Sequence, residues 1–197
     1  MHAAIGFRVK SGSAVAVLLA GPVESPQVLD RRIVELCDPA VPESRQPYHA
    51  GMGTLETDDA KLARRCEFVR RAAGRSVPEL IHEYRGCGHD LHGAGLVTGS
   101  DTDPARITNT HIRAHALEGQ LFRTALEDAI RSCELSCAVF IERKVYTRAT
   151  EILGQSEVEL KRAMTRMSRP PGGPWRADEK AAALAAWLVL ASRGEAG

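Results

Sequence analysis

The sequence predicts an α/β fold in which three antiparallel strands open the chain and strands then alternate with helices. Three observations support this prediction: apolar runs on both sides of a Ser-Gly-Ser turn at residues 11–13, a helical apolar period after residue 57, and short apolar runs between the helical segments. The chain has 197 residues, of which 44% are hydrophobic. This length supports one substantial core, so we expect a single domain over residues 1–197.

The three opening strands are predicted at residues 3–9, 14–19 and 28–37. The first two are apolar or alternating runs that flank the turn, and the third follows a connection that contains two prolines. Residues 39–57 are rich in Pro, Gly, Ser and His and show no period. We expect an irregular insertion or loop there that leaves the sheet.

The helical part of the chain begins at Thr57-Asp58-Asp59, a cluster of favourable N-cap residues. The apolar period that follows is expected to end at Gly74, because glycine is a common helix terminator. A second helix is predicted over residues 77–84, with Pro78 in its first turn.

The later elements are predicted in the order strand, long helix, strand and three helical segments. Asp103-Pro104 is expected to open the long helix, and residues 169–174 form a proline-rich connector before the last helix. That last helix is almost entirely Ala, Leu, Val and Trp after an acidic first turn, so it should be buried against the sheet. The predicted elements span residues 93–99, 103–130, 137–141, 143–153, 157–167 and 177–192.

Composition limits the classes of function. No apolar run is long enough to span a bilayer, and the first residues do not resemble a signal peptide, so we expect a cytoplasmic protein. Five scattered cysteines suit a reducing compartment better than a disulfide framework. The net charge of +1 is not that of a protein that grips nucleic acid non-specifically, so any such contact must use a local patch.

Several stretches resemble the RuvC-type Holliday-junction resolvases. That family opens with a Gly-hydrophobic-Asp-Pro-Gly-Ser turn, and here residues 6–11 read Gly-Phe-Arg-Val-Lys-Ser. Residues 116–119 (Ala-Leu-Glu-Gly) resemble a small-residue contact of the family, and residues 177–185 resemble its acidic, Ala- and Leu-rich closing helix. The resemblance implies a ribonuclease H-like fold (βββαβαβα), a mixed five-stranded sheet flanked by helices, and a homodimer.

The resemblance also implies about four carboxylates around two divalent cations, which clamp a phosphodiester. The position of the first acid falls on Arg8, whose guanidinium keeps its charge and repels Mg²⁺. The position of the second falls near Ser100, where Asp101 or Asp103 could supply one oxygen, although Asp103 before Pro104 is better explained as a helix cap. In the closing helix, Asp178 or Glu179 matches one family acid, but the partner position falls on Ala181 or Ala182.

These substitutions predict a degenerate catalytic site that lacks two-metal nuclease activity. We favour no cofactor, and expect Mg²⁺ or Mn²⁺ only if the site remains active. The alternative is a metal-assisted nuclease, or another hydrolase-type enzyme, that reuses the pocket. Its candidate acid, base or metal-binding groups are Asp101, Asp103, His111, His115, Asp178 and Glu179.

Two other groups of possible metal ligands have simpler interpretations. Cys87, His89 and His92, with His82 nearby, are ligand types at close spacing, but the spacing is not that of a structural zinc site and a polar loop is favoured. His111 and His115 lie four residues apart and share a helix face. We interpret them as solvated or packing histidines, with Glu118 on a neighbouring part of the surface.

The cations of the first strand are a separate signal. Arg8 and Lys10 should point towards the former catalytic surface. A cation there would bind a phosphate or carboxylate, or form an internal salt bridge with Asp101 or Glu179. Arg143 and Lys144 are further candidates for anion binding. Three functions stay open: a non-catalytic protein that binds branched or single-stranded nucleic acid or acts as a scaffold, an enzyme that reuses the pocket, and a structural oligomerisation module. No membrane contact is expected.

Overall fold

The sheet of this protein is mixed and five-stranded, as the sequence predicts. The structure is a computed structural model, and it describes residues 1–167 and 174–192. The strand order is β3-β2-β1-β4-β5; β1 is antiparallel to β2, β2 is antiparallel to β3, and β4 is parallel to both β1 and β5. The strands are β1 (His2–Lys10), β2 (Ser13–Ala20), β3 (Gln27–Glu35), β4 (Asp90–Thr98) and β5 (Cys137–Ile141).

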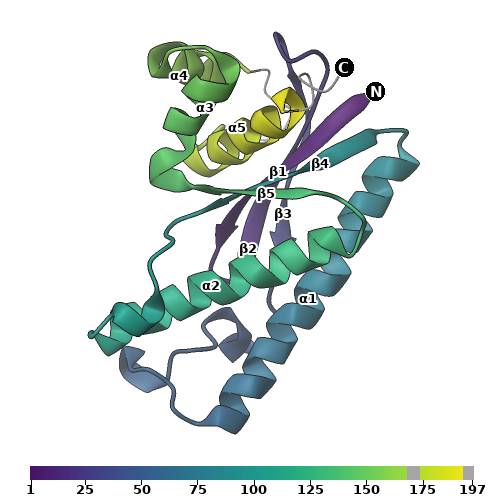
Figure 1. Cartoon of the computed structure of the whole chain (residues 1–197). Helices are drawn as coiled ribbons and strands as arrows, with labels where there is room; N and C mark the ends of the chain where they lie inside the picture. Colours follow the sequence, from purple (N-terminus) through teal and green to yellow (C-terminus); the bar gives the residue numbers. More distant parts are fainter. Residues whose placement is uncertain (168–173, 193–197) are drawn as a thin grey trace.

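Helices cover both faces of the sheet, with α1 and α2 on one face and α3, α4 and α5 on the other (Figure 1). Each face has its own hydrophobic core, because successive residues of a strand point to opposite sides. In β1, Ile5 and Phe7 belong to the core under α1 and α2, whereas Ala4 belongs to the core under α5. The helices are α1 (Asp59–Gly86), α2 (Thr110–Arg131), α3 (Val145–Leu153), α4 (Glu157–Arg166) and α5 (Ala177–Ala191).

Helix α5 lies directly on the backbone of the two central strands. Gly6 of β1 and Gly95 of β4 are paired in register, and together they form a surface without side chains beneath the helix. A Cβ on Gly6 would overlap the carbonyl oxygen of Ala182, and one on Gly95 would overlap that of Ala185. The two glycines therefore set how closely α5 approaches the sheet, and hence where its acidic first turn lies.

The predicted helix end at Gly74 is wrong, because α1 is one helix of 28 residues that continues through Pro78. Gly74 and Pro78 both disfavour a helix interior, but neither outweighs the packing of the apolar face on the sheet. Val77, Leu80 and Ile81 are buried on that face, beyond the expected end. The predicted N-terminal cap is confirmed, since the Asp58 carboxylate accepts from the backbone N–H groups of residues 60 and 61.

The long helix begins later than predicted. Asp103 is a cap, as expected, but of the short 3-10 helix Pro104–Arg106, which ends at Ile107. The α-helix itself starts at Thr110, where the Asn109 side chain accepts from the backbone N–H of Ile112. Two caps within seven residues thus divide this stretch into a turn and a helix.

Residues 39–57 form an irregular segment, as predicted, and it packs against the helices. It contains two short 3-10 helices, η1 (Pro42–Arg45) and η2 (Gly51–Gly53), and a single β-bridge between His49 and Leu55. Arg65 of α1 donates to the carbonyl oxygens of Pro47 and His49, each at 3.2 Å. These contacts hold His49 beside the helical layer.

Two further expectations concern the proline-rich connector and membrane-spanning helices. Residues 169–173 of the predicted proline-rich connector lie outside the described residues, and Pro174 is described. Among residues 1–167 and 174–192, no helix is long and apolar enough to cross a membrane.

Thiol reactivity should follow burial in this fold. Burial raises the pKa of Cys137, at the start of β5, to about 12, so almost none of its thiolate is present at pH 8. Cys87, directly after α1, is exposed. We expect iodoacetamide at pH 8 to modify Cys87 at least about 100-fold faster than Cys137, as followed by peptide mass spectrometry. In denaturant the two rates should converge; similar rates in the native protein would contradict the packing of β5.

Candidate functional site

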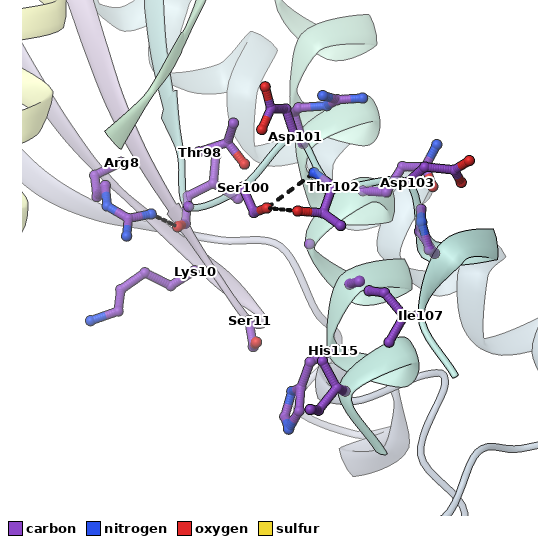
Figure 2. Close-up of a pocket in the computed structure, with 18 residues that line it drawn as sticks. Arg8, Lys10, Ser11, Thr98, Ser100, Asp101, Thr102, Asp103, Ile107 and His115 are labelled. Atoms are coloured by element: carbon purple, nitrogen blue, oxygen red, sulfur yellow. Dashed lines mark hydrogen bonds between the residues drawn. The ribbon is translucent and has the colours of Figure 1, made fainter. Parts of the chain in front are cut away.

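A cleft of about 720 Å³ lies where β1 and β4 end beside α2. Figure 2 shows Arg8 and Lys10 on one side of this cleft, with Ser100, Asp101 and His115 on the other. Both strands run in the same direction, so their carboxyl ends deliver polar residues to the same edge of the sheet. The sequence-predicted residues Arg8, Lys10, Ser100, Asp101, Asp103 and His115 all line this cleft.

Arg8 forms ion pairs with two carboxylates. Its Nη2 lies 2.6 Å from Glu142 Oε2, and its Nε lies 3.9 Å from Asp178 Oδ1. The Arg8 side chain is only 13% exposed, and it also donates to the carbonyl oxygen of Val9. An internal salt bridge was one of the two roles expected for a cation here, but the partners of Arg8 are Glu142 and Asp178 and not the expected Asp101 or Glu179.

The strand order and the position of α5 bring the two partners to Arg8. Glu142 comes directly after β5, and β5 lies one strand beyond β4, so its end reaches the same edge as Arg8. Asp178 lies in the first turn of α5, which crosses β1 next to Arg8. Glu142 had not been singled out, because only the strand order brings it to this edge.

Three acids expected at the metal site contact cations other than Arg8. Asp178 Oδ2 accepts from Lys10 Nζ at 2.7 Å, and Asp101 Oδ1 accepts from Arg143 Nη2 at 3.2 Å. Glu179 lies 3.8 Å from an Arg31 nitrogen, and it also accepts from the backbone N–H of residue 176. Ser100, near which the resemblance places the second acid, bonds to Thr102 within its own loop (Figure 2).

The described part of the chain does not gather the acids expected at the cleft around a single point. Mg²⁺ needs several oxygen ligands around the ion. Here Glu142 and Asp178 both pair with the guanidinium of Arg8, which keeps its positive charge. Among the described residues, two groups of three or more possible ligands come together, and neither includes Asp101, Asp178 or Glu179.

The expected anion-binding cations differ in exposure. Lys10 is 52% exposed and Arg143 is 70% exposed, so both can reach a ligand even though each contacts a carboxylate. Lys144 is exposed in the 3-10 helix η4 (Glu142–Lys144). Arg8, in contrast, is nearly enclosed by protein.

The structure does not bring Cys87, His89 and His92 together as a metal site. His92 contacts the ring of His2, and both histidines lie near Asp90. Cys87 is the exposed C-cap of α1, and the His89 ring faces that of Tyr84. Because β4 already begins at Asp90, His92 is a strand residue and not part of the predicted loop.

A third polar group forms where residues 39–57 meet α2. His111 and His115 share a helix face as predicted, and their ring centroids are 4.6 Å apart. The ring of His49 joins them at 5.2 Å from His111 and 4.5 Å from His115. Glu118 lies beneath: it is fully buried, and its Oε1 is 2.7 Å from His49 Nδ1.

His111 and His115 are exposed, which agrees with the solvated interpretation, and they also contact the ring of His49. The expectation that Glu118 lies on the surface is wrong, because it faces the core side of α2 beside Leu121 and Phe122. The sequence contained one usable signal, the spacing of three between His115 and Glu118. It contained none for His49, whose position depends on an irregular segment.

Comparison with known proteins supports the fold. No family model and no curated protein matches the chain. Thermus thermophilus RuvC superposes with a TM-score of 0.55 at 12% identity, covering 98% of this chain and 96% of that one. Its complex with a Holliday junction substrate gives a TM-score of 0.55 at 11% identity, covering 99% and 97%. The yeast mitochondrial Holliday junction resolvase gives a TM-score of 0.46 at 9% identity, covering 96% and 79%. With its mixed five-stranded sheet flanked by helices, the chain therefore has the ribonuclease H-like fold.

Proposed function

We propose that this protein is a catalytically degenerate relative of the RuvC-type resolvases that binds nucleic acid at the cleft without two-metal cleavage. The observation that carries the proposal is the ion pairing of Arg8 with Glu142 and Asp178. The guanidinium occupies the place of a metal-binding acid and supplies the positive charge that a divalent cation would otherwise bring.

The nucleic-acid part of the proposal depends on the exposed cations at the rim. Lys10, Arg143 and Lys144 surround the end of the sheet, and one structure of similar fold holds a Holliday junction substrate. Asp101 and Asp178 offset part of this charge. The affinity should therefore be modest and strongly dependent on salt.

Binding can be tested by fluorescence anisotropy with a labelled four-way junction and a labelled single strand. If three phosphates are contacted, the affinity for the junction should fall about 40-fold between 50 and 200 mM salt, because bound counterions are released. The double variant Arg143→Glu with Lys144→Glu should weaken binding at least about tenfold at 50 mM salt. Arg75→Glu, an exposed change on α1, is the matched control and should have little effect. Absence of binding at low salt would contradict the proposal.

Cleavage is the complementary assay. The same junction, incubated with Mg²⁺ or Mn²⁺, should remain intact on a denaturing gel. Metal-dependent cleavage by the wild-type chain, abolished when Asp178 and Glu179 are both replaced by alanine, would establish instead the alternative of a metal-assisted nuclease.

A further inference from the structure

We propose that His49, His111 and His115 bind one divalent transition-metal ion of the zinc class beside the cleft. One ring nitrogen of each histidine lies within 4.8 Å of one ring nitrogen of each of the others. Two of the histidines come from α2 and the third from the irregular segment before α1. This site is separate from the carboxylates around Arg8, and its existence does not depend on nucleic-acid binding.

Hydrogen bonds determine which ring nitrogen is available on two of the histidines. His111 Nδ1 lies 2.8 Å from the carbonyl oxygen of Gly53, which can only accept, so Nδ1 carries the proton. His49 Nδ1 likewise donates to the Glu118 carboxylate, which also accepts from the backbone N–H of Tyr48. Nε2 of both rings is therefore left with its lone pair. Metal-binding histidines are oriented in the same way, by a carboxylate or carbonyl on the other nitrogen.

His49 provides the independent sign of a missing partner. Its side chain is 7% exposed, yet its buried Nε2 has no hydrogen-bond partner. Buried ring nitrogens are normally paired, and an unpaired one calls for an explanation. Glu118 Oε2 is also buried without a hydrogen bond, at 3.6 Å from His115 Nδ1. A cation among the three rings would take the His49 lone pair and offset the buried charge of Glu118.

The surrounding chain holds His49 in place. Arg65 fixes its carbonyl oxygen, and the bridge to Leu55 closes the segment that carries Gly53. Gly53 has a φ of +77°, and a Cβ there would lie 3.1 Å from His111 Nδ1. Gly53 thus combines a left-handed backbone with a close approach to one proposed ligand, so that its carbonyl can orient the ring.

The ligand chemistry selects the kind of metal. Three imidazoles suit zinc and its neighbours in the first transition row, whereas Mg²⁺ prefers oxygen. Tetrahedral bonds of 2.0–2.1 Å would bring the three nitrogens to about 3.4 Å from one another, so the rings must close slightly around the ion. His115 lines the cleft and its side chain is 47% exposed. The fourth coordination position is therefore open to water or to an anionic group of a molecule in the cleft.

The second group of possible ligands, His2, Asp90 and His92, provides an internal control. The side chains of His2 and Asp90 are 73% and 63% exposed. One nitrogen of each ring is already engaged: His2 Nδ1 contacts both Asp90 Oδ2 and His92 Nε2. That group has no unpaired buried nitrogen, so we assign it no metal.

The test is zinc binding by the 197-residue chain after chelator treatment. Titration with zinc chloride, followed by calorimetry and by competition with a chromophoric chelator, should give one ion per chain with a submicromolar Kd. Cobalt(II) in its place should give the visible absorption of a four-coordinate site.

His111→Ala, an exposed change, should weaken zinc binding at least about 100-fold. Glu118→Gln should weaken it about tenfold or more and shift the cobalt bands, which a purely structural role would not do. His92→Ala is the matched control and should bind as the wild type does.

Three results would overturn this site. They are the absence of stoichiometric zinc in the folded wild-type chain, unchanged affinity in the double variant His111→Ala with His115→Ala, and loss of zinc in His92→Ala. Circular dichroism before each titration confirms that the variants are folded. If His49→Ala fails this check, the exposed His111→Ala variant still decides the question.

Discussion

Replacing Gly6 by alanine should lower the free energy of unfolding by about 3 kcal/mol, because overpacking at a rigid contact costs this much. The added Cβ would overlap the carbonyl oxygen of Ala182, and this atom belongs to the backbone of α5 and cannot rotate away. The helix would have to lift from the sheet, and all nine consecutive residues from 182 to 190 are buried in this helix. Thermal unfolding should show a decrease in Tm of about 10 °C for a chain of this size.

Gly74→Ala is the matched control for Gly6→Ala. Gly74 is exposed inside α1, and no atom lies within 4 Å of the place that its Cβ would take. Alanine is the better helix former, so this change should raise stability by about 0.5–1 kcal/mol. The same chemical substitution thus has opposite expected signs at the two positions. A near-neutral Gly6→Ala would contradict the close packing of α5 on β1.

The order of the strands and helices could be predicted from the sequence because it depends on local patterns. Alternation around residues 11–13 and the cap at Asp58 are visible within a few neighbouring residues. The errors arose where packing outweighs local preference. Gly74 and Pro78 favour a helix end, but Val77 and Ile81 gain more from burial on the sheet.

The candidate site was predictable only in part, for a similar reason. The anomaly at Arg8 is visible in the sequence, because a cation stands where the resembling family has an acid. Its partners are 134 and 170 residues away, and only the sheet order and the position of α5 identify them. His49 was missed because no periodic pattern places residues 39–57 against α2.

Replacing Arg8 by methionine should lower the free energy of unfolding by about 2 kcal/mol, the usual contribution of hydrogen bonds to a charged group. Methionine retains much of the apolar stem but removes the positive charge from beside Glu142 and Asp178. In the presence of a metal chelator, the Tm of the variant should be about 6 °C below that of the wild type. Because Glu142 and Asp178 both lose the charge of Arg8, 10 mM Mg²⁺ should recover part of the loss in the variant and leave the wild type unchanged.

Arg143→Met separates this effect from the loss of any cation at the cleft. Arg143 also pairs with a carboxylate, Asp101, but its side chain is 70% exposed and the pair is screened by solvent. We therefore expect a loss of less than about 1 kcal/mol and no Mg²⁺ dependence. Mg²⁺ is the informative ion because it does not compete for imidazole ligands such as those of the proposed histidine site. If wild type and Arg8→Met respond equally to Mg²⁺, the guanidinium does not replace a metal charge, and the degenerate-site interpretation loses its physical basis.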